Sequence, residues 1–220
     1  SYWLTAQSDA ELGRVFFTWG LIPAKLMQGE GYLTLLTSMF LHGGWMHLLG
    51  NMLFLWIYGD NLEEEMGHFG FVLFYLACGL ASGLAEALAA PQSFVPLVGA
   101  SGAIAGVMGG YLLLYPKARV DVLIILFVFF RIFAIPAWIV LSLWFAIQIL
   151  SGLAISTEFG GVAYWAHAGG FAAGLVLTLP VWRRRGARTF WQATQGRPPH
   201  PQTQFKAARS AVPLVSRHRR

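Results

Sequence analysis

Charged residues are scarce in this chain of 220 residues: Asp, Glu, Lys and Arg together make up 11%, whereas 56% of the residues are hydrophobic. A soluble domain typically carries about 25% charged residues. The composition therefore excludes an ordinary soluble domain and predicts a protein that is embedded in a membrane.

Cysteine is nearly absent, because Cys78 is the single one, and this excludes a disulfide within the chain. Cys78 lies inside an apolar run and is expected to be a small buried hydrophobic residue. No set of Cys, His and carboxylate residues has the spacing of a zinc site. His42 and His47 are five residues apart, which would place them about 140° apart around a helix. We therefore expect no metal and no cofactor.

Long uncharged runs are abundant, and five of them predict membrane-crossing helices, since a bilayer core of about 30 Å needs about 20 apolar residues. The runs are residues 32–59, 69–85, 97–115, 132–156 and 162–182. The run 69–85 is short, but its helix could continue past Glu86. The stretch 122–130 is too short to span and is expected at the membrane interface or leading into the next helix. The predicted fold class is all-α, a polytopic transmembrane helical bundle.

Basic residues indicate the orientation of these helices. Lys117 and Arg119 follow the third run, and a cluster of arginines follows the last run, whereas residues 90–96 and 160–161 carry no Lys or Arg. The positive-inside rule then places the C-terminus in the cytoplasm. Residues 32–182 are the predicted membrane domain, and residues 1–31 are predicted to be an outward-facing amphipathic segment.

Residues 183–220 contain no Asp or Glu and several prolines. We expect a disordered basic tail that is attracted to anionic lipid. No base-reading motif accompanies the basic residues, so no nucleic-acid partner is expected.

Two glycine-containing motifs lie near the starts of apolar runs: Gly99-Ala100-Ser101-Gly102 and Ala166-His167-Ala168-Gly169-Gly170. A hydroxyl and an imidazole within a membrane are costly unless they are paired or used. Both runs would enter from the outer side, so Ser101 and His167 would lie at a similar shallow depth that water can reach. The pattern indicates a nucleophilic Ser101 and a general base, His167, as peptide hydrolysis requires.

Small residues at spacings of three and four favour close helix packing on both of these runs. They are Gly99, Gly102, Gly106 and Gly110 on one run, and Gly170 and Gly174 on the other. Such packing would bring the hydroxyl and the imidazole within hydrogen-bond reach.

His47 and Asn51 are four residues apart in the first run and share a helix face. Both side chains can donate hydrogen bonds, so they could stabilise a tetrahedral oxyanion together with the Ser101 backbone N–H. The alternative is that they simply join two helices by hydrogen bonds. His42 lies nearer the outer end and is expected to be structural.

These motifs occur in an ordered set that resembles the rhomboid intramembrane serine proteases. The set comprises His42-x4-His47-x3-Asn51, Gly59-x3-Glu63-x3-Gly67, Gly99-Ala100-Ser101-Gly102 and Ala166-His167-x2-Gly170-x3-Gly174. The resemblance implies a six-helix core, a Ser101–His167 dyad without a third acidic member, and an oxyanion hole served by His47 and Asn51. It also implies that Trp144 and Phe145 belong to a lateral gate for substrate helices.

Three departures from the family pattern are visible. The family's first helix would precede Ser1, so a helix is expected upstream of this sequence. The Trp-Arg pair that is frequent in the family's outer loop is not found near residues 32–34, and Ala105 stands where some members have a tyrosine that packs on the catalytic histidine.

The predicted function is that of an intramembrane serine endopeptidase which cleaves transmembrane protein substrates near the outer membrane face, in the inner membrane if the host is bacterial. The alternative is a catalytically inactive relative that binds transmembrane clients. A transporter with a histidine proton path is disfavoured, because the polar groups cluster in the outer half of the predicted helices.

Overall fold

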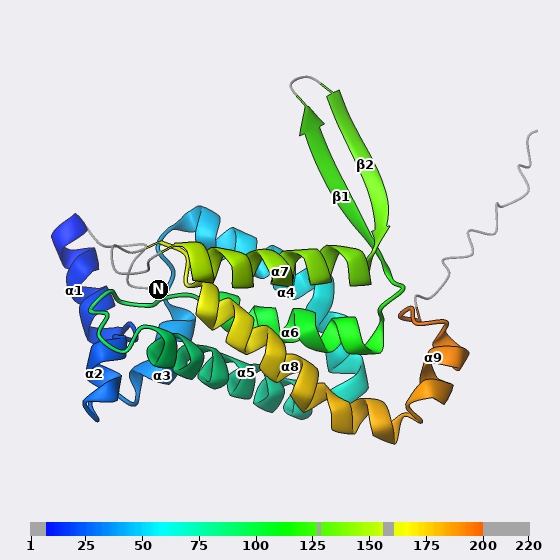
Figure 1. Cartoon of the computed structure of the whole chain (residues 1–220), viewed down its shortest axis with the longest axis horizontal. Coiled ribbons are helices and arrows are strands. Elements are labelled where there is room, and N and C mark those ends of the chain that lie inside the picture. The colour runs from blue at the N-terminus through cyan, green and yellow to red at the C-terminus, as the bar shows by residue number, and fades with distance from the viewer. Residues whose placement is uncertain (1–7, 127–128, 156–160, 200–220) are drawn as a thin grey trace, which may run out of the picture.

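The structure, a computed structural model, describes residues 8–126, 129–155 and 161–199, and long helices dominate it (Figure 1). In chain order the elements are α1 (Asp9–Trp19), α2 (Pro23–Met27), α3 (Thr34–Thr37), η2 (Ser38–Phe40), α4 (Trp45–Met66), α5 (His68–Ala89), α6 (Ser101–Leu114), β1 (Arg119–Leu126), β2 (Phe129–Pro136), α7 (Ala137–Ala154), α8 (Tyr164–Arg184) and α9 (Arg188–Thr194). The five long helices α4 to α8 correspond to the five predicted runs, so the prediction of an all-α bundle is confirmed.

Helix α6 is the centre of the bundle and packs against α4, α5, α7 and α8. Eleven of its fourteen residues are buried. Most of them are Gly, Ala or other small residues, which lets the surrounding helices approach its backbone.

The closest approach is between α6 and α8. A Cβ added at Gly170 would overlap the carbonyl oxygen of Gly102, and one added at Gly174 would overlap that of Gly106. Gly170 and Gly174 therefore let α8 touch the α6 backbone, whereas a Cβ at Gly102 or Gly106 would meet Ser82 or Cys78 of α5. This contact fixes how far α8 can slide along α6.

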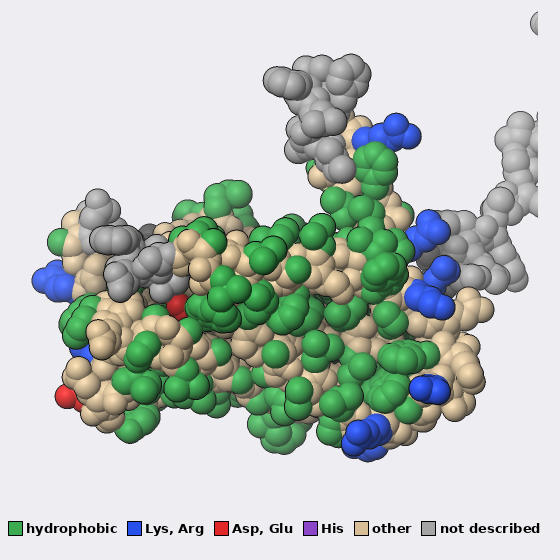
Figure 2. Space-filling view, viewed as in Figure 1, with side chains coloured by type: hydrophobic (Ala, Val, Ile, Leu, Met, Phe, Trp, Pro, Cys, Tyr) green, Lys and Arg blue, Asp and Glu red, His purple; other side chains and the backbone are tan. Residues whose placement is uncertain are grey.

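The outer surface of the bundle is strongly apolar, as the face in Figure 2 shows. Helices α5 and α7 are long and apolar enough, by length and composition, to cross a membrane. Helix α7 has only Ala137, Leu141 and Gln148 among its buried residues. Side chains such as Leu143 and Leu150 are exposed by 60% and 65%, which suits a lipid environment.

Two predicted helix starts were wrong. The first predicted run begins at residue 32, but the short helices α3 and η2 occupy residues 34–40 and α4 begins at Trp45. The third run begins at residue 97, but α6 begins at Ser101, because Gly99 has φ +129° and cannot continue a helix. The helix of the second run does extend past Glu86, to Ala89.

A third predicted helix start, at residue 132, was also wrong. Strands β1 and β2 form an antiparallel hairpin, with Arg119 opposite Pro136 and Leu126 opposite Phe129, so Ile132 lies in a strand and not in a helix. Many of its residues are β-branched or aromatic, and these favour strands. Figure 1 shows the hairpin projecting from the end of the bundle that also carries α9.

The prediction of disorder for residues 183–220 was wrong over residues 188–194, which form α9. Phe190 is buried, and the indole N–H of Trp191 donates to the carbonyl oxygen of Leu113 at 2.9 Å. These two aromatic residues hold the basic segment against the end of α6. The remainder of the tail, residues 200–220, lies outside the described residues.

At the opposite end of the bundle, the N-terminal segment holds the chain that leads into α6. Leu21 and Leu97 exchange two backbone hydrogen bonds, of 3.0 and 2.7 Å, and the N–H of Gly99 donates to the carbonyl oxygen of Ser38 at 2.9 Å. The residues before Ser101 are therefore tied to the residues around α2 and η2.

The first prediction concerns the contact between α6 and α8. Gly174→Ala would force a methyl group into the backbone of α6 and should lower the free energy of unfolding by about 1–3 kcal/mol or more. The matched control is Gly70→Ala in α5, where a Cβ would meet only Met66 Cβ at 3.5 Å, an ordinary contact. Unfolding in a denaturing-detergent titration measures both. Equal stability of the two variants would contradict the close contact.

Candidate active site

Ser101 and His167 lie side by side. Ser101 is the first residue of α6 and His167 the fourth residue of α8, and both helices begin at the same end of the bundle. The distance from Ser101 Oγ to His167 Nε2 is 2.8 Å. This is hydrogen-bond length, so the imidazole is placed to accept the hydroxyl proton.

The other ring nitrogen of His167 has a partner that the sequence did not single out. Its Nδ1 lies 2.9 Å from Oε1 of Gln148, a buried residue of α7. An amide oxygen can only accept, so Nδ1 carries the hydrogen and Nε2 presents its lone pair to Ser101. The available signal was an amide side chain in the middle of an apolar run.

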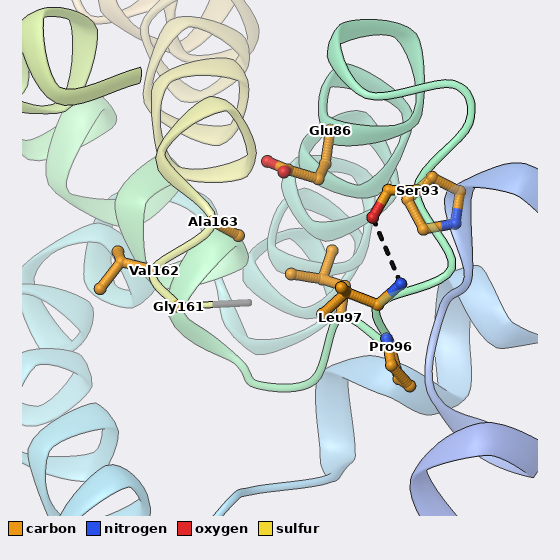
Figure 3. Close-up of a pocket in the computed structure, with 9 residues that line it drawn as sticks. Glu86, Ser93, Pro96, Leu97, Gly161, Val162 and Ala163 are labelled. Atoms are coloured by element: carbon orange, nitrogen blue, oxygen red, sulfur yellow. Dashed lines mark hydrogen bonds between the residues drawn. The ribbon is translucent and has the colours of Figure 1, made fainter. Parts of the chain in front are cut away.

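Glu86 fixes the start of the helix that carries His167. Its buried carboxylate on α5 accepts the backbone N–H of Ala166 at 2.8 Å. The first N–H groups of a helix have no partner within it and lie at the positive end of its dipole, so a carboxylate there stabilises the helix start. Figure 3 shows Glu86 pointing from α5 toward Ala163, beside a small hollow of about 40 Å³.

Two larger cavities reach Ser101 and His167. One, of about 450 Å³, is lined by His47 together with residues 96–98 and 161–163 from the loops at this end. The other, of about 270 Å³, lies between α4 and α7 and is lined by Asn51 and Trp144 among others. The first lies among the loops at this end of the bundle, and the second is lined by residues of α4, α6, α7 and α8.

His47 and Asn51 both line the second cavity with Ser101. The backbone N–H of Gly43 donates to Nδ1 of His47 at 3.3 Å, which leaves the hydrogen of this ring on Nε2. The buried Nδ2 of Asn51 has no hydrogen-bond partner among the described residues. An unsatisfied buried donor is costly, and this one belongs to a residue that lines the same cavity as Ser101.

Gly99 makes room for the His47 ring. A Cβ at this position would lie 2.8 Å from the ring, and its φ of +129° is a conformation that side chains disfavour. The sequence pattern had suggested that Gly99 packs one helix on another. Instead, its lack of a side chain leaves space for the His47 ring.

The expected separation of His42 and His47 was wrong. His42 precedes α4, and the two rings meet edge to face with centroids 5.2 Å apart. The angular argument fails because it assumed one continuous helix. Among the described residues no three of His, Cys, Asp and Glu are grouped closely enough to hold a metal ion.

The two aromatic residues assigned to a gate both face α8. The Trp144 ring lies 5.7 Å from the His167 ring, and Phe145 stacks on Phe171 at 4.7 Å. Trp144 thus packs on the His167 ring.

Comparison with known proteins supplies the family. A model of the Rhomboid domain matches residues 29–184. RHOMBOID-like protein 4 of Arabidopsis thaliana is 33% identical over 72% of this chain and 36% of its own length. Rhomboid-like protein 11, chloroplastic, of the same plant is 35% identical over 66% of this chain and 50% of its own length.

A third relative, Rhomboid protease GluP of Bacillus subtilis (strain 168), is 41% identical over 40% of this chain and 16% of its own length. The chain therefore spans half or less of the length of these three relatives.

The second prediction concerns the carboxylate of Glu86 at the start of α8. Glu86→Ala leaves buried N–H groups of α8 without an acceptor and should lower the free energy of unfolding by about 1–3 kcal/mol. Glu86→Gln keeps an acceptor oxygen of the same reach and should lose less. Hydrogen–deuterium exchange at residues 164–168 should speed up in Glu86→Ala. Identical exchange and stability in the two variants would exclude the capping role.

Proposed function

The chain belongs to the rhomboid family, a family of membrane proteins, and from this premise we propose that it is an intramembrane serine endopeptidase. The family includes relatives that are named proteases. The observation that carries the proposal for this chain is the 2.8 Å hydrogen bond between Ser101 Oγ and His167 Nε2. A serine and a histidine at this distance can act as nucleophile and general base.

In the proposed reaction Ser101 Oγ attacks the carbonyl carbon of the scissile peptide bond while its proton moves to His167 Nε2. The carbon–nitrogen bond then breaks as His167 returns this proton to the leaving amine. Water attacks the resulting ester, gives one proton to Nε2 and releases the new carboxyl group. The proton on Nε2 finally returns to Ser101.

Three donors are available for the oxyanion of the tetrahedral intermediate. The Ser101 N–H is at the N-terminus of α6, where backbone N–H groups lack helical acceptors. Nε2 of His47 and Nδ2 of Asn51 belong to residues that line the same cavity. Donors that are already in place when charge develops are effective, because they need no reorganisation.

The substrates we propose are transmembrane helices that unwind near the outer membrane face. Their peptide bonds are otherwise hydrogen-bonded within the helix and shielded. The cavity between α4 and α7, with Trp144 in its wall, is the proposed lateral entrance, and Phe145 beside it is part of the proposed gate. Water would reach the serine through the cavity at the end of the bundle.

This mechanism implies an orientation. Ser101 and the N-terminal segment lie at one end of the bundle, and most of the Lys and Arg side chains in Figure 2 gather at the other, where α8 ends. We propose that the basic end, including the C-terminus, is cytoplasmic and contacts anionic lipid. In a bacterial host the membrane would be the inner one.

Ser101→Ala makes the third prediction. The variant should cleave a labelled transmembrane substrate in reconstituted vesicles at a rate indistinguishable from vesicles without protein, because it lacks the nucleophile. Ser142→Ala, an exposed serine of α7, is the matched control and should retain full activity. A fluorophosphonate should label the wild type and the control only. Full cleavage by Ser101→Ala would overturn the proposal, and an unlabelled, inactive wild type that still binds helices would support a client-binding protein instead.

Asn51→Ala makes the fourth prediction. Loss of one oxyanion donor typically costs about 2.7–4 kcal/mol of transition-state stabilisation, or about 10²–10³ in kcat. Asn61→Ala removes another buried asparagine of α4, remote from Ser101, and should leave kcat within about twofold. If both variants lose activity in proportion to their stability, Asn51 only holds the helix in place.

A further inference from the structure

We propose that Gln148 is a positioning residue for His167, so that the base is held by a neutral amide and the functional unit comprises three side chains rather than two. This inference rests on the proposed function and concerns the same site. The observation behind it is the continuous chain of hydrogen bonds from Gln148 through His167 to Ser101, of 2.9 and 2.8 Å.

The burial of Gln148 is unusual for its helix. It is 6% exposed, whereas its neighbour Ile147 is 48% exposed and Leu150 is 65% exposed. A polar side chain on a largely lipid-facing helix is costly and is normally paired within the protein. The partner of this amide is the proposed general base itself, which distinguishes it from an amide that merely joins two helices.

A second, longer contact favours one direction of the amide. Nε2 of Gln148 donates to the carbonyl oxygen of Trp144, one helical turn earlier in α7, at 3.4 Å. A reversed amide would set its oxygen against this carbonyl oxygen and its NH₂ group against the imidazole. The contact with the Trp144 carbonyl therefore agrees with Oε1 of Gln148 lying toward Nδ1 of His167.

The tautomer follows from this direction. With Nδ1–H donating to Gln148, Nε2 of His167 has no hydrogen and can accept the proton of Ser101. The opposite tautomer would present Nε2–H to the serine and could not act as a base. Gln148 thus performs the orienting task that a buried carboxylate performs in other serine proteases.

A neutral amide suits this location in two ways. It orients the ring without burying a second ionised group, which a membrane disfavours. It also accepts from the imidazolium that forms during the reaction, and the Trp144 ring at 5.7 Å adds an aromatic face to the same cation. Gln148 and Trp144 therefore support His167 together, from one face of α7.

Kinetics with three variants test the proposal. Gln148→Met keeps the length and apolar volume but accepts no hydrogen bond from Nδ1 of comparable strength. A hydrogen bond to an ionised group is worth about 10- to 100-fold in rate, so kcat should fall by roughly that factor while KM changes little. Gln148→Glu restores an acceptor of the same reach and should be at least several-fold faster than Gln148→Met. Ser142→Ala should match the wild type.

A spectroscopic measurement separates orientation from folding. In protein labelled with ¹⁵N-histidine, the ring nitrogens of His167, assigned by their loss in His167→Asn, should report the Nδ1–H tautomer in the wild type. In Gln148→Met they should report a mixture or the opposite tautomer, while unfolding stability stays close to that of Ser142→Ala.

The outcomes also separate this inference from the proposed function. Full cleavage by Ser101→Ala defeats both. An inactive Ser101→Ala together with a Gln148→Met variant of wild-type kcat and unchanged His167 tautomer leaves the protease assignment intact and overturns the role of Gln148. If the kcat of Gln148→Glu were no higher than that of Gln148→Met, this would also contradict the role of residue 148 as a hydrogen-bond acceptor.

Discussion

The direct contact between the backbones of α6 and α8 is the constraint on which the site depends. Gly170 meets the carbonyl of Gly102, and Gly174 meets that of Gly106, with no space for a methyl group. The contact begins one residue beyond Ser101 and three beyond His167, so it sets the separation of these two side chains. A lipid environment supplies no hydrophobic force between helices, and close packing of this kind takes its place.

The polar groups of the bundle are arranged around that contact. Glu86 anchors the start of α8, Gln148 holds the far side of the imidazole, and the pair Leu21 and Leu97 anchors the chain before α6. A buried polar group that did not help to hold these helices and His167 in place would cost free energy without stabilising the structure. Asn51 Nδ2 and Thr178 Oγ1 are among the buried atoms that have no hydrogen-bond partner within the described residues.

Much of this arrangement could be predicted from the sequence. The five long helices follow from uncharged runs, and the pairing of Ser101 with His167 follows from two glycine motifs at similar positions in parallel helices. Gln148 was missed because a single amide gives no periodic signal, and its partner is distant in the sequence. The hairpin was missed because its run of Val, Ile and Phe satisfies a helix, a strand or an interfacial segment equally well. The contact of His42 with His47 depends on a chain bend that periodicity does not reveal.

The sparse burial of α7 has a consequence for timing. This helix is held to the bundle by few inward side chains, yet it carries the amide and the indole that touch His167. If α7 moved outward to admit a proposed substrate helix, Gln148 and Trp144 would move away from His167, and Nδ1 of the imidazole would lose its hydrogen-bond partner. In the proposed reaction, substrate entry by such a movement and proton transfer by His167 would therefore be separate steps, and His167 would regain its hydrogen-bond partner only after α7 had returned to α8.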